Sequence, residues 1–258
     1  MTFLRQSFLI LFALVLSGGQ IFAASKEERA FTAATAAFQA KMWNRAETEF
    51  AQFAENFPDS TNVPQAVLLQ AQAKFNQQQF AGSIALLNDN MSKADVLSDQ
   101  YVYWIGEAEF ASSNFSGAAD TFAVLAQNFP DSPLSLRATV EQASALSKMN
   151  NWPQVVSLLG DANGVFQHAA QTDAANELVL RGRLIQAQGL FAQNDFADEA
   201  AVLNAINPKL LSPDLNWQFE YLRYQLAGAT GDWNAALTAT TNLLQTAGSQ
   251  RNTDLAAE

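Results

Sequence analysis

The sequence predicts an all-α fold made of about six stacked helix pairs. Three observations support it: an aromatic residue recurs at a nearly constant interval, other columns keep fixed distances from it, and turn-forming residues precede it. The recurring residues, here called the marker aromatics, are Trp43, Phe80, Phe115, Trp152, Phe196 and Trp233. Four of their five intervals are 35 to 37 residues and one is 44. Self-similarity at this period is typical of a helical repeat array.

Columns on either side of the marker aromatics place each of them at the start of a second helix. The residue nine positions earlier is small in five of six units, as a close helix crossing requires: Ala34, Ala71, Gly106, Ala143 and Ala187, with Tyr224 in the sixth. The residues three and seven positions later share one helical face with the aromatic. In unit order they are Ala46, Ser83, Ala118, Val155, Glu199 and Ala236, then Phe50, Leu87, Phe122, Leu159, Leu203 and Thr240.

Turn residues separate the two helices of a pair and one pair from the next. Asp195 and Asp232 directly precede two marker aromatics and are good N-caps. The pentapeptide Asn-Phe-Pro-Asp-Ser occurs at 56–60 and again at 128–132, two periods later. Its proline ends the second helix, because proline has no N–H and disfavours helix in the residue before it.

The helix pairs are therefore expected at 26–57, 64–90, 99–129, 135–159, 176–204 and 214–245. Residues 160–172 are expected to hold an extra turn or loop. The tail 249–258 is polar and has no evident amphipathic cap, whereas terminal repeats of a solenoid normally carry a polar outer face. This leaves open that the chain is the N-terminal part of a longer protein.

Residues 1–23 are predicted to be a secretory signal peptide that is removed after Ala23. Arg5 precedes an apolar run from Phe8 to Leu16, which is about half of the roughly 20 residues that a bilayer crossing needs. The mature chain is then expected to be soluble and exported, with a repeat domain over 24–248, a polar tail and no transmembrane helix. The absence of cysteine excludes a lipid-modified N-terminus, disulfides and thiolate chemistry.

Charge and residue inventory disfavour two classes of function. The net charge of -11 repels phosphate backbones, so nucleic-acid binding is not expected, and solubility explains the charge equally well. The single histidine, His168, lies in the 160–172 insertion and is interpreted as solvated. Glu107 and Glu109 point to different faces of a helix, and no phosphate loop, nucleophile elbow or histidine pair is present. We therefore predict no catalytic residue, metal or cofactor, and no enzyme.

These columns resemble the tetratricopeptide repeat, in which an aromatic opens the second helix, alanine follows three residues later and proline closes the unit. The third unit matches best, with Gly106, Phe115, Ala118, Phe122 and Pro130. In units two, four and five another residue replaces the alanine and the closing proline is missing. The resemblance covers nearly all of residues 26–247. It implies a right-handed superhelix whose concave surface is lined by the first helices.

The Phe-Pro-Asp-Ser closings and the signal peptide resemble a subgroup of this family found in bacterial cell envelopes. That subgroup includes the tetratricopeptide lipoprotein of the outer-membrane β-barrel assembly machinery and the accessory protein of the Tol-Pal system. Two features depart from those proteins. The sequence has no cysteine after the signal and no coiled-coil stretch ahead of the repeats.

Two sets of residues are candidate partner contacts on the first helices. Tyr103, Phe110, Phe191 and Tyr221 lie 12 or five positions before a marker aromatic, hence on one helical face. They either grip an apolar peptide segment or form ordinary inter-repeat core. Arg137, Lys148 and Arg181, with Arg183, form a basic group that either anchors a carboxylate or pairs with Glu141 and Glu177.

The sequence thus predicts a non-catalytic periplasmic scaffold or adaptor that binds envelope proteins or peptides through a concave groove. The alternative is an interaction or assembly module at the N-terminus of a longer multi-repeat or enzymatic envelope protein. An enzyme of envelope polysaccharide metabolism would need a converging pair of acids, which the sequence does not show. The lysine and asparagine clamp of some tetratricopeptide domains is not expected either, because this face carries Phe, Leu, Tyr and Val.

Overall fold

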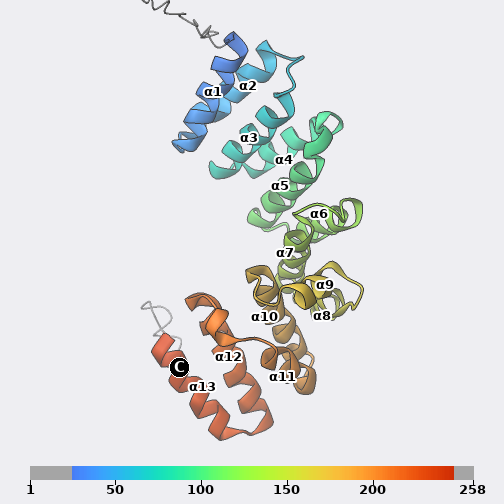
Figure 1. Ribbon diagram of the computed structural model, residues 1–258, viewed down its shortest axis with the longest axis vertical. Coiled ribbons are helices and arrows are strands. Elements are labelled where there is room, and N and C mark those ends of the chain that lie inside the picture. The colour runs from blue at the N-terminus through green and yellow to red at the C-terminus, as the bar shows by residue number, and fades with distance from the viewer. Residues whose placement is uncertain (1–24, 247–258) are drawn as a thin grey trace, which may run out of the picture.

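The computed structural model describes residues 25–246, which form thirteen α-helices, three short 3-10 helices and no strand (Figure 1). Twelve of the helices form six antiparallel pairs. The pairs are α1 (Lys26–Gln39) with α2 (Trp43–Asn56), α3 (Val63–Asn76) with α4 (Phe80–Asp89), α5 (Ser98–Ala111) with α6 (Phe115–Asn128), α7 (Ser135–Lys148) with α8 (Trp152–Gly160), α10 (Glu177–Ala192) with α11 (Phe196–Asn204), and α12 (Pro213–Thr230) with α13 (Trp233–Thr246). This confirms the predicted all-α helical-repeat superhelix.

Each marker aromatic is the first residue of the second helix in its pair. The residue two positions earlier always has a positive φ, between 56° and 75° in the six pairs, so a left-handed residue ends every first helix. These residues are Lys41, Gln78, Ser113, Asn150, Asn194 and Gly231. Asp195 and Asp232 then cap the following helices by accepting hydrogen bonds from the backbone N–H groups of Asp198 and Ala235. The turn between the two helices therefore has the same backbone geometry in all six pairs.

In the first five pairs the two helices cross closely because the residue nine positions before the marker is small. At Gly106 a Cβ atom would lie 2.7 Å from the ring of Phe122, so only glycine fits there. Phe122 is fully buried and belongs to a cluster that runs from α5 to α9. Further clusters span α1 to α3, α3 to α5 and α10 to α12, so the core continues along the solenoid.

The 160–172 insertion differs from the expected turn or loop, because its second half is the helix α9 (Val165–Thr172). Phe166 of α9 is fully buried, and a Cβ atom at Gly182 of α10 would lie only 2.2 Å from its ring. Gln167 donates a hydrogen bond to the carbonyl oxygen of Leu159 at 2.5 Å. One buried aromatic therefore turns a polar connection into a packed helix, which lies beside α8 in Figure 1.

The connections between the pairs are short, and two of them are held by side-chain hydrogen bonds. At the ends of the two pentapeptides, the hydroxyl of Ser60 donates to Glu27, and that of Ser132 donates to Asp99 at 2.5 Å. Both bonds link the end of a pair to the first turn of its own first helix. Three 3-10 helices, Met91–Lys93, Asp95–Leu97 and Pro208–Leu210, occupy longer connections.

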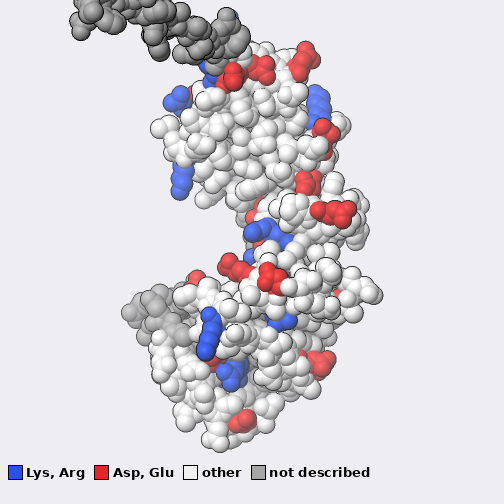
Figure 2. Space-filling view, viewed as in Figure 1, with Lys and Arg blue, Asp and Glu red and all other residues white. Residues whose placement is uncertain are grey.

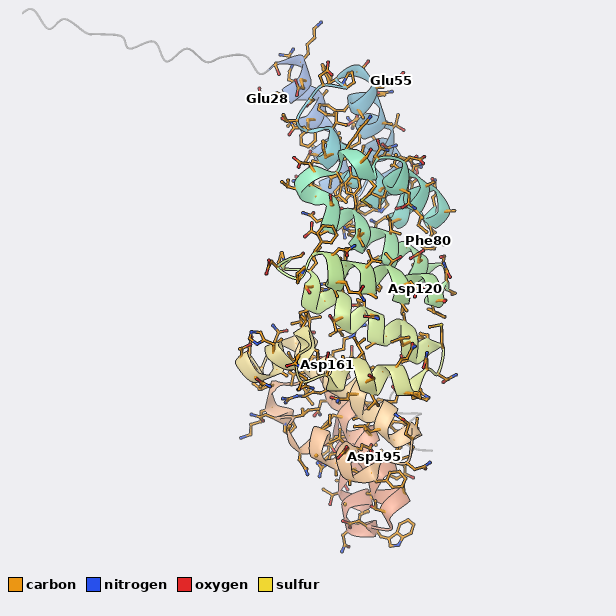
Figure 3. All side chains as sticks on the ribbon, turned by 90° about the vertical axis from the view of Figure 1, so that its right-hand side faces the viewer. Glu28, Glu55, Phe80, Asp120, Asp161 and Asp195 are labelled. Carbon is orange, nitrogen blue, oxygen red and sulfur yellow. The ribbon has the colours of Figure 1, made fainter. Side chains whose placement is uncertain are left out.

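The pairs stack along the long axis of the molecule, as the side view shows with Phe80, Asp120 and Asp195 at successive levels (Figure 3). No helix within residues 25–246 has the length and apolarity to span a bilayer. The predicted signal peptide and the whole of the predicted polar tail lie outside the described residues.

Candidate functional site

The inner face of the superhelix is formed by the first helices of the pairs. In Figure 1, α1, α3, α5, α7 and α10 succeed one another along one side of the molecule, while α2, α4, α6 and α8 lie on the other. Column positions 12 and five residues before each marker belong to these first helices. All seven predicted partner residues therefore lie on α5, α7, α10 or α12.

At the narrow middle of the molecule, three first helices bring five polar side chains together, here called the waist cluster. Its members are Tyr103 and Glu107 of α5, Arg137 and Glu141 of α7, and Arg181 of α10. Figure 2 shows basic and acidic atoms gathered at this level. The cluster carries both signs of charge within an otherwise acidic chain.

Arg181 and Glu141 form a two-point ion pair. The two guanidinium nitrogens Nη1 and Nη2 donate to the carboxylate at 2.8 and 3.0 Å, and Nη2 also reaches the hydroxyl of Ser144 at 3.2 Å. Fork-to-carboxylate pairing of this kind is geometrically specific and joins α10 to α7. The alternative interpretation of Arg181, an ion pair with Glu141, is thus what the structure shows.

Burial raises the pKa of two further members of the waist cluster, Glu107 and Tyr103. The pKa of Glu107 is raised, chiefly by burial and also by the negative charge of the neighbouring Glu141. The hydrogen bond from Tyr103 and the charges of Arg137 and Arg181 lower it, but by less. Burial also raises the pKa of the Tyr103 hydroxyl, with the Glu107 carboxylate adding to the effect. A carboxyl that holds its proton more strongly can act as a hydrogen-bond donor as well as an acceptor.

The remaining basic residues differ in what they contact. Arg183 donates from Nη1 to the carbonyl oxygen of Ala205 at 2.6 Å, so it fixes the connection after α11. Within residues 25–246, Arg137 and Lys148 are exposed and form no ion pair within 4.0 Å. The guanidinium of Arg181 is already paired with Glu141. A partner carboxylate can therefore reach the guanidinium of Arg137 without displacing a carboxylate of the chain itself.

The two predicted phenylalanines lie against marker aromatics. The ring centroid of Phe110 is 5.2 Å from that of Phe115, and that of Phe191 is 5.8 Å from that of Phe196. Both side chains are half-buried. Both rings therefore pack within their own pair, and Phe110 also packs against the core cluster that runs from α5 to α9.

Tyr221 borders a hollow between α10 and α12, here called the α10–α12 groove. Its volume is about 480 Å³, and it is lined by Leu184, Ile185, Gln188, Trp217, Gln218, Tyr221, Leu222 and Gln225. The rings of Trp217 and Tyr221 stack at 5.3 Å with 9° between their planes, and Tyr221 is 39% exposed. No charged residue lines this groove. Its aromatic wall, aliphatic floor and amide rim suit an uncharged side chain and the peptide groups beside it.

Trp217 and the three glutamines were not predicted as site residues from the sequence. Trp217 and Tyr221 are four residues apart, and Gln218 and Gln225 are seven apart, so each pair shares a helical face. That spacing is a signal of a groove face. The spacing alone could not predict the groove, because only the packing of α12 on α10 shows that these residues surround a hollow.

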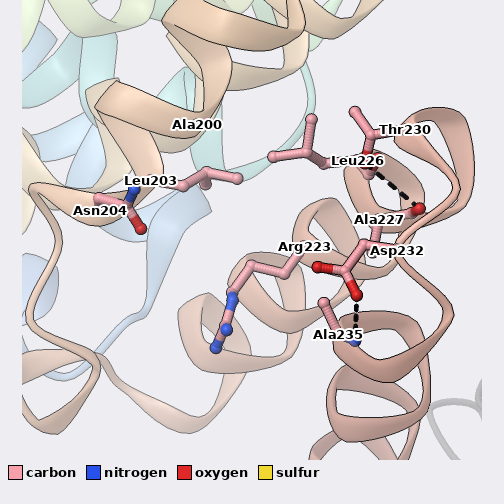
Figure 4. A pocket seen from close by; sticks show the side chains of 9 residues that line it. All are labelled: Ala200, Leu203, Asn204, Arg223, Leu226, Ala227, Thr230, Asp232 and Ala235. Carbon is pink, nitrogen blue, oxygen red and sulfur yellow. Dashed lines mark hydrogen bonds between the residues drawn. The ribbon is translucent and has the colours of Figure 1, made fainter.

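A second hollow, between α11, α12 and α13, has a volume of about 170 Å³ (Figure 4). Three of its polar side chains have partners: Asp232 caps α13 at Ala235, and the hydroxyl of Thr230 donates to the carbonyl oxygen of Leu226. Arg223 lies 3.7 Å from the carboxylate of Glu220. This hollow is small and most of its polar side chains have partners, so we do not assign it a ligand.

Nothing in residues 25–246 gathers three or more histidine, aspartate or glutamate side chains in a metal-binding arrangement. His168 lies on α9, where it is exposed. Glu107 and Glu109 lie two residues apart on α5 and have different partners, since Glu109 accepts a hydrogen bond from Thr121 at 2.6 Å.

The geometry agrees with comparisons to known proteins. Residues 30–60 and 100–132, the first and third pairs, match the model of the tetratricopeptide repeat. Both stretches end in the repeated pentapeptide. No curated protein matches the chain in sequence.

Among solved structures, the chain is similar to BtubC (BKLC) from P. vanneervenii, with a TM-score of 0.62 and 11% identity over 88% of this chain and 94% of that one. A second similar structure, the TPR2AB domain of yeast Sti1 in complex with pHSP90, has a TM-score of 0.37 and 12% identity over 91% and 96% of the two chains. At this identity the first likeness shows the fold alone. Tetratricopeptide folds are typically non-catalytic scaffolds that bind proteins or peptides.

Proposed function

We propose that this chain is a scaffold of the bacterial periplasm that binds an extended segment of another cell-envelope protein along its inner face. The observation that carries the proposal is the α10–α12 groove, which holds an exposed aromatic wall and no charge. One of its walls, α10, packs on α7, the helix that carries the exposed Arg137. A segment that seats an apolar side chain in the groove then presents a neighbouring acidic residue to Arg137. The signal-peptide pattern of residues 1–23 supports export.

Selection from a displayed library of random peptides tests the binding part of the proposal. We expect the selected peptides to share an apolar or aromatic residue together with an acidic residue. Tyr221→Ala is expected to weaken their binding at least tenfold, because a buried aromatic contact dominates such interfaces. Tyr224→Ala is the matched control, since Tyr224 is exposed on the same helix and does not line the groove.

Charge reversal separates the two parts of the site. Arg137→Glu is expected to weaken binding of the selected peptides, with the loss reduced at high salt because screening weakens exposed charge pairs. Arg45→Glu, on the outer helix α2, is the control. Binding that survives both Tyr221→Ala and Arg137→Glu unchanged contradicts the proposed groove.

The location has its own test. Expressed in a bacterium, the chain is expected in the periplasmic fraction with Ala24 at its N-terminus, as read by mass spectrometry of the purified protein. A chain that stays in the cytoplasm with residues 1–23 attached contradicts export and leaves the binding experiments unaffected.

A further inference from the structure

The last helix, α13, carries an apolar row that no other described element covers. Trp233 is 73% exposed, Leu237 is 68% exposed and Leu244 is 54% exposed. Their spacing of four and seven residues puts them on one face of the helix. α13 also contains no charged side chain, although the chain as a whole has a net charge of -11. This face is therefore suited to protein contact rather than to solvent.

Internal junctions show what covers this face elsewhere in the superhelix. In the fourth pair, Val156 lies four residues after its marker, as Leu237 does in the sixth. A Cβ atom at Gly189, seven residues before the next marker, would lie 3.0 Å from Val156 and 3.7 Å from the ring of Trp152. At this junction the second helix of the fourth pair therefore packs its marker and the residue four positions later onto a small residue of the next first helix.

That column holds a small residue in the first five pairs, whereas the sixth pair has Leu226 there. Ala73, Ala108, Ala145 and Gly189 occupy it in the second to fifth pairs, and all four are buried under the preceding pair. In the first pair the equivalent residue is Ala36, and there it is exposed together with Ala33 and Ala40. α1 therefore offers an unpartnered small-residue face, and α13 offers an unpartnered large-residue face.

We propose that these two faces bind each other between copies of the chain, so that α13 of one copy stacks on α1 of the next. Trp233 and Leu237 then pack on Ala36, as Trp152 and Val156 pack on Gly189 inside one chain. Such a head-to-tail contact repeats the junction used between the fourth and fifth pairs, and it builds an open or closed array according to its rotation. Among residues 247–258, Leu255 is the sole large apolar residue, so that tail is a poorer match for a three-residue apolar row.

The lack of native cysteine allows a direct test by disulfide trapping. Two single variants, Leu237→Cys and Ala36→Cys, are purified as the full exported chain, mixed and oxidised. We expect a disulfide-linked dimer in the mixture and a ladder of multimers from the double variant on a non-reducing gel. Ala85→Cys, at an exposed position of α4, is the matched control for random collision.

Three outcomes overturn the proposal. A dimer formed by Leu237→Cys alone, at the level of the mixture, means that α13 packs on α13. A dimer formed by Ala36→Cys alone means that α1 packs on α1. Trapping in the mixture that does not exceed that of Leu237→Cys mixed with Ala85→Cys means that the faces do not meet.

Sedimentation of the cysteine-free chain gives an independent measurement. The weight-average mass is expected to rise with protein concentration and to rise further with salt, which screens repulsion between acidic copies. Leu237→Glu is expected to raise the dissociation constant at least tenfold with an unchanged helical circular dichroism spectrum. A wild-type chain that remains monomeric up to high micromolar concentration contradicts the head-to-tail contact.

Discussion

The third and fifth pairs place different side chains in the same buried position. Ala118 and Glu199 each follow their marker aromatic by three residues, and both are fully buried. Ala118 packs in an apolar cluster, whereas neither carboxylate oxygen of Glu199 has a hydrogen-bond partner among the described residues. The repeat geometry therefore fixes where a side chain lies, and the chemistry of that side chain decides how much its burial lowers the stability of the fold.

The same contrast extends to the two ends of the molecule. In the last pair, Trp217 and Glu220 also have buried polar atoms without a partner among the described residues, whereas in the first three pairs only Glu49 has one. In the first and third pairs, the Ser60 and Ser132 closings satisfy the connecting turns instead. We expect the C-terminal pairs, which contain the α10–α12 groove, to open more readily than the N-terminal ones.

The largest expected effect on stability comes from placing a buried glutamate in the third pair, at the position that Glu199 occupies in the fifth. Ala118→Glu places an unpaired carboxyl in an apolar cluster and is expected to lower the free energy of unfolding by about 4 kcal/mol at pH 8. Urea denaturation followed by circular dichroism measures it. Ala118→Ser is the control, with a loss under about 1 kcal/mol, because Ser83 occupies this position in the second pair and donates to the carbonyl oxygen of Ala71 at 2.9 Å. Equal losses contradict the burial argument.

The reverse change is expected to stabilise the fifth pair. Burial raises the pKa of Glu199 from its ordinary value of 4.5 to about 7. Between these values the folded chain keeps a proton that the unfolded chain loses, so this residue lowers stability as pH rises from 4.5 to 7. Glu199→Ala is expected to raise the free energy of unfolding by about 2 to 3 kcal/mol at pH 8 and to change it little at pH 4. A difference between wild type and variant that is independent of pH contradicts this.

The waist cluster gives an intermediate effect. Arg181→Gln leaves Glu141, whose side chain is 12% exposed, without its two-point partner. We expect a loss of about 1 to 2 kcal/mol in the free energy of unfolding, because Arg181 itself is 39% exposed and solvent screens part of the pair. Glu141→Gln in the same chain is expected to restore part of the loss. Arg45→Gln, which removes a surface pair with Glu49, is expected to change stability by under about 0.5 kcal/mol.

The smallest effect concerns the closing turns. Ser132→Ala removes the hydroxyl that joins the end of the third pair to Asp99 and is expected to cost about 1 kcal/mol. Hydrogen exchange in α5 and α6 is expected to rise more than exchange in α10 and α11. Uniform acceleration along the chain contradicts a local role for this bond.

Much of the fold was predictable because each helix pair repeats the same residue types at the same spacing along the chain. The six marker aromatics open six second helices, and the expected pairs agree with the observed ones to within about two residues at each end. The helix α9 was missed because an eight-residue segment with one buried aromatic has no periodic signal to separate it from a loop. Glu199 was visible as a departure from its column, but its lack of a partner depends on the helices that surround it.

The sequence by itself determined the number of pairs, the residue that begins each second helix and the crossings that need small side chains, because these depend on neighbours within one repeat. The tertiary structure decided which polar groups meet. Arg181 of α10 reaches Glu141 of α7, 40 residues away, and Trp217 with Tyr221 of α12 forms a groove with α10. Contacts between pairs depend on how one pair is rotated on the next, and that rotation follows from the whole packed interface rather than from any single column.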